Sequence, residues 1–187
     1  MVARDCLGKH LVFESAAGLL AGRIVEVEAY VGVRDRAAHS FAGRRSKRNE
    51  VMYGRAGFAY VFLIYGIHHH LNLVTGGPGE PTAVLLRAVE PLAGEDLMQR
   101  RRNVTVRTLL TSGPGKLCQA FAIGLDYNGA DLCAGPLYLT DGAPPRRIQR
   151  TPRIGVAYAG AWARRLLRFV DPDSAFLSPL GRRFAAR

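Results

Sequence analysis

The chain has 187 residues, with 26 Lys and Arg against 15 Asp and Glu, and therefore a formal net charge of +11. A hydrophobic content of 48% and a charged content of 22% are typical of a globular protein, which excludes general disorder, a collagen-like chain and a disulfide scaffold. A positive field of this size on one small domain attracts a polyanion, most simply nucleic acid. The alternative is a basic protein without such a partner.

Targeting and redox signals are weak. No apolar run approaches the ~20 residues of a transmembrane helix, and the first residues have no apolar signal segment. We therefore expect a cytoplasmic protein that forms one domain over residues 1–187 and has no membrane partner. The odd number of cysteines and the absence of a CxxC motif argue against a disulfide framework or a zinc ribbon. Cys6, Cys118 and Cys133 are expected to be buried thiols.

The first half of the chain reads as a sheet with a surface loop, and the core sheet is expected between residues 20 and 90. In chain order we expect first a short helix over 4–10 and a strand over 21–30, with Val25, Val27 and Ala29 on one face of the strand. An Arg-rich loop over 34–49, with at most one helical turn, should follow. Strands over 58–64 and 67–74 should form a tight hairpin, and a further strand over 83–89 should end at Glu90-Pro91.

The second half is expected to add helices and short strands. Residues 93–102 read as a helix, and Pro114-Gly115 opens another helix that runs to about Ile123. Short strands are expected near 136–140 and 153–157, followed by a polar tail.

Glu26, Glu28 and Tyr30 alternate with apolar residues and should project to one side of their strand, about 6.7 Å apart in succession. Such a group indicates either a solvated strand face or a general base that activates water. The spacing also resembles the carboxylate pair of an inverting glycosidase.

Tyr65 lies at the tip of the predicted hairpin, beside Gly66, which accepts the positive φ that such a turn needs. An aromatic ring at the tip of a basic protein suggests a wedge between stacked bases. The alternative is a ring folded back onto the sheet.

Histidines and a glycine-rich turn are further candidates. His68 and His70 share one strand face, but a metal site needs a third ligand that the spacing does not supply. Asn72 shares that face, and its side-chain amide needs hydrogen-bond partners if it is buried. The turn before Lys116 lacks phosphate-loop spacing, which excludes a nucleoside triphosphate, but a helix N-terminus with Gly and Lys can hold a DNA phosphate.

A set of blocks in fixed order resembles the alkyladenine (3-methyladenine) DNA glycosylase family over nearly the whole chain. The blocks are residues 22–30, Asp35 with 37–40, 48–49, 52–53, 60–61, 64–66, 71–72, 84–91, 113–120 and 151–155. The resemblance implies an α+β single domain with a curved, mainly antiparallel sheet, short flanking helices and a β-hairpin that inserts into DNA. It implies a cofactor-free and metal-free monomer in the bacterial cytoplasm, on the nucleoid when bound to double-stranded DNA that contains damaged purines.

The resemblance also implies roles for single residues. Glu28 matches the general base, and Arg87 matches an arginine beside that glutamate and its water. Tyr30, His39, Phe62 and Asn72 match residues that line the base pocket, and Tyr65 matches the side chain that replaces the flipped nucleotide. Arg44 and Lys116 are expected at the DNA backbone.

The implied reaction flips a damaged purine out of the stack and hydrolyses its N-glycosidic bond, which leaves an abasic site. No lysine lies near the site in sequence, so a lyase step is not expected. Phe62 departs from the tyrosine of the familiar members, which affects the breadth of substrates. The competing class is a non-catalytic nucleic-acid-binding module, while a nuclease would need an acidic metal cluster that the sequence lacks.

Overall fold

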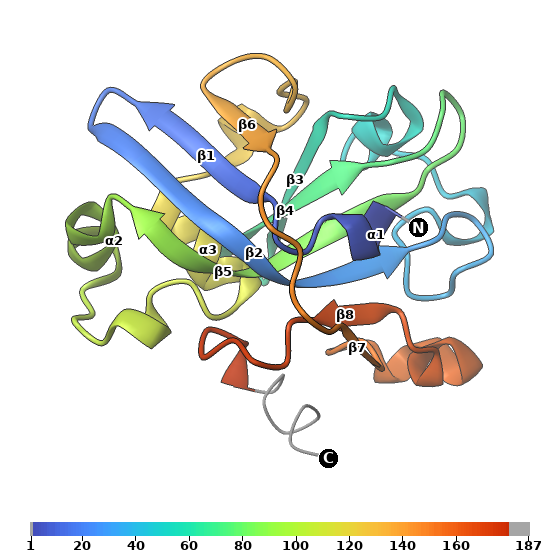
Figure 1. Cartoon of the computed structure of the whole chain (residues 1–187). Coiled ribbons are helices and arrows are strands. Elements are labelled where there is room, and N and C mark those ends of the chain that lie inside the picture. Colours follow the sequence, from blue (N-terminus) through green and yellow to red (C-terminus); the bar gives the residue numbers. More distant parts are fainter. Residues whose placement is uncertain (1, 180–187) are drawn as a thin grey trace.

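A computed structural model describes residues 2–179, and its main feature is an antiparallel sheet that curls around one core (Figure 1). The strands are β1 (His10–Ser15), β2 (Gly18–Tyr30), β3 (Ala59–Ile64), β4 (His68–Val74), β5 (Ala83–Ala93), β6 (Leu137–Thr140), β7 (Gln149–Thr151) and β8 (Arg168–Val170). The α-helices are α1 (Val2–Asp5), α2 (Glu95–Arg102) and α3 (Pro114–Phe121), and the 3-10 helices are Phe41–Gly43, Glu50–Tyr53, Arg107–Leu109, Leu125–Tyr127 and Ala157–Arg164. The predicted α+β fold is confirmed. The predicted domain boundary reaches residues 1 and 180–187, which lie outside the described residues.

The long strand β2 lies at the centre of the sheet. The strand order is β3-β4-β5-β2-β1-β6, so that β5 covers one edge of β2. Two short strands share the other edge, because β1 pairs with residues 18–23 and β8 pairs with residues 26–28. The sheet therefore branches halfway along β2, just where its acidic residues begin.

A β-bulge at this branch changes which side chains of β2 face the core. Ile24 pairs with Val89 and Glu26 pairs with Ala88, so two residues of β2 oppose one step of β5. Ile24 and Val27 therefore both face the main core, and Val25 packs into a separate small cluster. The expectation that Val25 shares a face with Val27 is wrong, because the extra residue shifts the alternation by one position.

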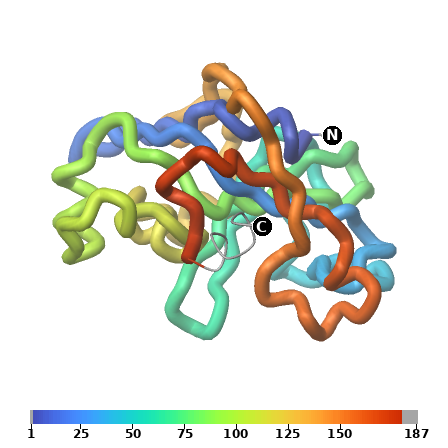
Figure 2. The backbone as a smooth tube through the Cα atoms, turned by 60° about the horizontal axis from the view of Figure 1, so that its bottom comes forward, coloured from blue at the N-terminus to red at the C-terminus, as the bar shows by residue number. Residues whose placement is uncertain are grey.

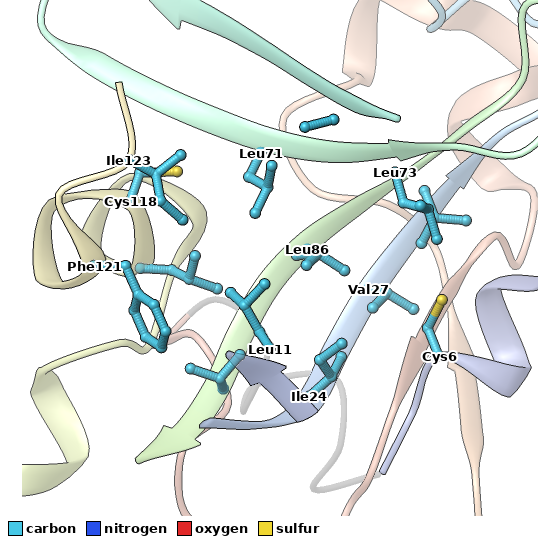
Figure 3. Close-up of a cluster of buried hydrophobic side chains, with 14 of the residues drawn as sticks. Cys6, Leu11, Ile24, Val27, Leu71, Leu73, Leu86, Cys118, Phe121 and Ile123 are labelled. Carbon is cyan, nitrogen blue, oxygen red and sulfur yellow. The ribbon is translucent and has the colours of Figure 1, made fainter. Parts of the chain in front are cut away.

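The main core fills the concave side of the sheet, under the helices. Leu11, Ile24, Val27 and Leu86 of the sheet lie in one cluster of buried side chains with Phe121 of α3 (Figure 3). Helix α3 packs on β4 and β5, and α2 packs on α3, so both predicted helices are confirmed with bounds close to the expected ones.

The cysteines are not all buried as expected. Cys6 and Cys118 lie in the core, where burial raises the pKa of the two thiols to about 11 and about 12. Cys133 is exposed in a loop, where its backbone N–H donates a hydrogen bond to the carboxylate of Asp131.

The N-terminal helix is shorter than expected. Helix α1 ends at Asp5, and Gly8 then adopts a φ of +89°, which a helix cannot continue. The chain can therefore enter β1 at His10, the last residue of the expected helix.

Strand β5 continues through Pro91, where it was expected to stop. Pro91 pairs with Gly22 at a second register shift, where a missing N–H is tolerated. The side chain of Val89 fills the space beside Gly22, because a Cβ on Gly22 would lie 2.6 Å from Cγ2 of Val89. The strand expected over 153–157 is wrong, because strands β7 and β8 flank this segment and the loop between them carries it.

The turn between β3 and β4 is the tight hairpin that the sequence predicts. Tyr65 and Gly66 both have positive φ, at 53° and 73°, and the N–H of Ile67 donates to the carbonyl of Ile64. The backbone tube shows this turn extending away from the body, on the same side as the segment near residues 155–165 (Figure 2).

Candidate active site and DNA interface

Glu28 is fully buried, and its carboxylate is held by three residues that line one cavity. Its Oε1 accepts a hydrogen bond from the N–H of Ile154 at 2.8 Å and lies 3.2 Å from a guanidinium nitrogen of Arg87. Its Oε2 accepts a hydrogen bond from the hydroxyl of Tyr30 at 3.0 Å. Ile154, Arg87 and Tyr30 all line the cavity, so the carboxylate lies directly behind the cavity wall in a fixed orientation.

Glu26 faces the same guanidinium but has a different environment. Its carboxylate lies 2.8 Å from Arg87 and 2.8 Å from Arg168, and it accepts hydrogen bonds from the N–H and hydroxyl of Ser178. Burial raises the pKa of Glu26, but the two guanidiniums and the Ser178 N–H outweigh burial and lower it below its ordinary value. Glu26 does not line the cavity, so the two predicted carboxylates separate into one beside the cavity and one inside a buried ionic network.

Arg87 joins the two carboxylates. It projects from β5 and is buried, with one nitrogen toward each glutamate. Burial alone would lower the pKa of Arg87, but Glu28 and Glu26 together raise it. The arginine therefore remains a cation in the lining of the cavity.

The cavity has a volume of about 250 Å³ and is lined by aromatic rings together with aliphatic and a few polar side chains. On one wall, Tyr60 and Phe62 of β3 stand next to His70 and Asn72 of β4, because Tyr60 pairs with Asn72 and Phe62 pairs with His70. The alternate residues of both strands face the core, so this wall follows directly from strand alternation. Small ligands bind in such cavities, which combine apolar rings with a few fixed polar groups.

Tyr30 of β2 also lines the cavity, and Arg153 packs against its ring. The guanidinium of Arg153 lies 4.7 Å from the centre of its ring, and Arg153 forms a fully buried ion pair with Asp35. Burial and the nearby Glu28 raise the pKa of Tyr30 well above its ordinary value, so its hydroxyl keeps its proton. Sequence reasoning gave Arg153 no role, although it lies in a block that carries the resemblance.

His39 and Asn72 fix the polar side of the cavity. The Nδ1 of His39 lies 2.8 Å from the hydroxyl of Tyr60, with which it shares a hydrogen bond, and its ring lies 4.6 Å from that of Phe62. The surrounding protein and Arg48 lower the pKa of His39 below its ordinary value. The amide of Asn72 donates to the carbonyl of Tyr60 at 3.0 Å. All four residues expected in the base pocket therefore line one cavity with Arg87.

Tyr65 stands at the rim of the cavity with 87% of its surface exposed. A ring folded back onto the sheet is therefore excluded. Tyr158, which sequence reasoning missed, also lines the cavity and is 70% exposed. Two exposed tyrosines thus flank one cavity mouth, and Ile67 beside them is 72% exposed.

The two candidate backbone contacts lie outside the cavity lining. Arg44 is exposed in the loop after residues 41–43, and Lys116 is half-buried in the first turn of α3, where Pro114 borders the cavity. Arg48 lies closer to the hairpin, because it donates to the carbonyl of Leu63 and its guanidinium is 5.2 Å from the ring centre of Phe62. Arg48 could have been singled out from the sequence, because it belongs to block 48–49 of the family resemblance.

The histidine triplet alternates along β4, with His68 and His70 on one face and His69 on the other. His70 lines the cavity, whereas His68 and His69 lie near α3 and the turn that follows it. Among residues 2–179, no group of three His, Cys, Asp or Glu side chains is placed to hold a metal ion. Across the same residues, no helix is long and apolar enough to cross a membrane.

A buried carboxylate behind a ring-lined cavity, with exposed aromatics at the mouth of a basic molecule, fits an enzyme that takes one ring system out of a nucleic acid. Comparison with known proteins agrees with this class, because the model of the family described as methylpurine-DNA glycosylase matches residues 1–175. The chain belongs to this family. It is a DNA glycosylase, a hydrolase of N-glycosyl bonds that acts on DNA.

Curated relatives support the same assignment over nearly their full length. A relative from Methanocella arvoryzae is 51% identical over 95% of this chain and 89% of its own length, and one from Methanoculleus marisnigri is 48% identical over 95% and 92%. A third, from Desulfitobacterium hafniense, is 44% identical over 95% and 92%. Each is named "Putative 3-methyladenine DNA glycosylase".

Proposed function

We propose that this protein excises alkylated or deaminated purines, 3-methyladenine among them, from double-stranded DNA with a water molecule that Glu28 activates. The observation that carries the proposal is the anchoring of Glu28 to Tyr30, Arg87 and Ile154, all of which line the cavity. A base that must take a proton from water needs a fixed position next to the reacting carbon. The three contacts supply that position.

In the proposed reaction, the bond between C1′ and N9 of the purine breaks, and its electron pair leaves with the purine. The water oxygen bonds to C1′, and the water proton passes to Glu28. Positive charge that develops on the sugar is stabilised by the negative carboxylate beside it. An intact abasic site is the product, because no lysine lines the cavity among the described residues and a Schiff-base step requires an amine.

The base must leave the helix before this step, which costs a few kcal/mol. Tyr65 is placed to fill the vacated space, since it stands exposed at the tip of a hairpin beside the cavity mouth. Tyr30 and Phe62 present ring faces to the extruded base, and ring faces attract cationic alkylated purines. Arg44 and Lys116 are assigned to backbone phosphates. The protein acts as a monomer at the chromosome, in the cytoplasm.

The test compares base release from alkylated duplex DNA by the wild type and by Glu28→Gln. The variant keeps the size of the side chain but removes the base, so single-turnover excision should fall by at least ~100-fold while DNA binding persists. Glu14→Gln, an exposed strand residue bonded to Tyr138, is the matched control and should be fully active. Full activity of Glu28→Gln, or a loss confined to Glu26→Gln, would show that the base is assigned to the wrong residue.

The same assay addresses the competing class. A nucleic-acid-binding module would bind the alkylated duplex and release no base. Absence of release by the wild type from any damaged purine would overturn the proposed function as a whole.

A further inference from the structure

His70 is a half-buried side chain in the wall of the cavity, and the reaction described above does not use it. It pairs directly with Phe62 across β3 and β4, and the two ring centres are 5.4 Å apart. Asn72 lies two residues further along the same strand and on the same face. A base that stacks on Phe62 therefore presents its edge near this part of the wall.

Most polar side chains of the cavity wall already have hydrogen-bond partners within the protein. His39 and Tyr60 bond to each other, Asn72 donates to a carbonyl, and Tyr30 donates to Glu28. Within residues 2–179, neither ring nitrogen of His70 has a hydrogen-bond partner. It thus offers one donor and one acceptor to whatever enters the cavity.

The charge of His70 is fixed by its surroundings. Burial lowers its pKa to about 4, and the positive charge of Arg87 from β5, together with His68 and His39, acts in the same direction. The imidazole is therefore neutral at pH 7. A neutral ring does not repel a cationic purine, yet it still donates one hydrogen bond.

From this geometry we propose that His70 is a specificity-determining residue whose ring N–H donates a hydrogen bond to the edge of a flipped purine and so admits uncharged damaged purines as substrates. This inference rests on the proposed function and names a substrate class for the same site.

The change of charge on bond cleavage explains why release of uncharged purines depends on the His70 N–H more than release of cationic purines does. When the bond from C1′ to N9 breaks, the electron pair turns an uncharged purine such as hypoxanthine into an anion, whereas it neutralises a cation such as 7-methylguanine. A fixed donor stabilises developing negative charge in a partly dry site. Loss of the donor should therefore slow release of hypoxanthine more than release of 7-methylguanine.

The experiment measures single-turnover release from two duplexes, one with a single hypoxanthine and one with a single 7-methylguanine. His70→Leu removes the donor and should slow hypoxanthine release by ~10-fold to ~100-fold, while 7-methylguanine release should change by less than about threefold. His70→Gln restores an N–H donor and should stay within about threefold of the wild type on both duplexes. His69→Leu is the matched control, because His69 points to the opposite face of β4, and it should affect neither rate.

Each outcome bears on the inference. Equal slowing on both duplexes, unchanged rates in His70→Leu, or failure of His70→Gln to restore hypoxanthine release would overturn it. A wild type that releases 7-methylguanine but no hypoxanthine would also overturn it and leave the proposed function standing. A wild type that releases neither base contradicts the proposed function itself.

Discussion

Replacement of Tyr65 by alanine separates a role in DNA from a role in folding. With 87% of its surface exposed, Tyr65 leaves only about an eighth of its side chain buried in the free protein. Aromatic side chains bury about 200 Å² when fully enclosed, so Tyr65 buries about 25 Å², worth roughly 0.6 kcal/mol at 25 cal/mol per Å². A core tyrosine would instead cost about 3–5 kcal/mol on truncation.

The effect on DNA should be much larger than the effect on stability. A ring that stacks on bases contributes about 1–3 kcal/mol, which corresponds to a loss of ~5-fold to ~150-fold in the affinity for a lesion in duplex DNA. Excision from the duplex should slow in parallel. On a single-stranded lesion the effect should be smaller, because no stack has to be opened.

The assay combines thermal unfolding of Tyr65→Ala with excision from matched duplex and single-stranded substrates. We expect a small change in Tm and a loss of activity that is specific to the duplex. A fall of several kcal/mol in the free energy of unfolding, with a proportionate loss on both substrates, would refute the wedge. Excision from the duplex by Tyr65→Ala at the rate of the wild type would also refute the wedge.

Three further predictions concern charge. Glu26→Gln should lower the free energy of unfolding by about 3 kcal/mol in urea titrations, because it leaves Arg87 and Arg168 buried with less counter-charge, and a loss below about 1 kcal/mol would contradict this. Affinity for undamaged duplex should fall on the order of 100-fold between about 50 and 200 mM salt if about four phosphates are neutralised, and a flat response would argue against electrostatic binding. His70 has a pKa of about 4 when folded and 6.5 as a free side chain, so the unfolded chain binds more protons between these values and stability should fall as the pH drops from 6.5 to 4. His39 also has a pKa of about 4 and adds a loss of its own, so the two proteins should differ by the His70 share alone. At pH 5 that share should be about 2 kcal/mol, missing in His70→Gln, and equal slopes in the two proteins would exclude His70 as a source of the loss.

Strand alternation made much of the cavity wall predictable. A period of two places His70 and Asn72 on one side of β4, and Leu71 on the other, in any sheet that contains this strand. The tight turn at Tyr65-Gly66 was equally readable, because it depends on backbone preferences of two adjacent residues. Even so, the sequence left open whether Tyr65 packs on the sheet, since that depends on neighbours distant in the chain.

Other features were not readable because long-range contacts create them. The bulge at Glu26 forms where β8 replaces β1 beside β2, and it sends Val25 away from the core. Pro91 remains in its strand only because a bulge opposite Gly22 removes the need for its N–H. The sequence around Val25 and around Pro91 does not reveal either position, because both depend on strands that are distant in the chain.

By itself the sequence determined the composition of the molecule: its positive charge, the order of most strands, the aromatic turn and the acidic strand. Tertiary structure alone decided how the two glutamates differ. Arg168 and Ser178, more than 140 residues further along the chain, enclose Glu26, whereas Ile154 and Arg87 fix Glu28 behind the cavity. The physical reason is that the surroundings of a buried charge are set by groups brought together in folding, and no local pattern encodes them.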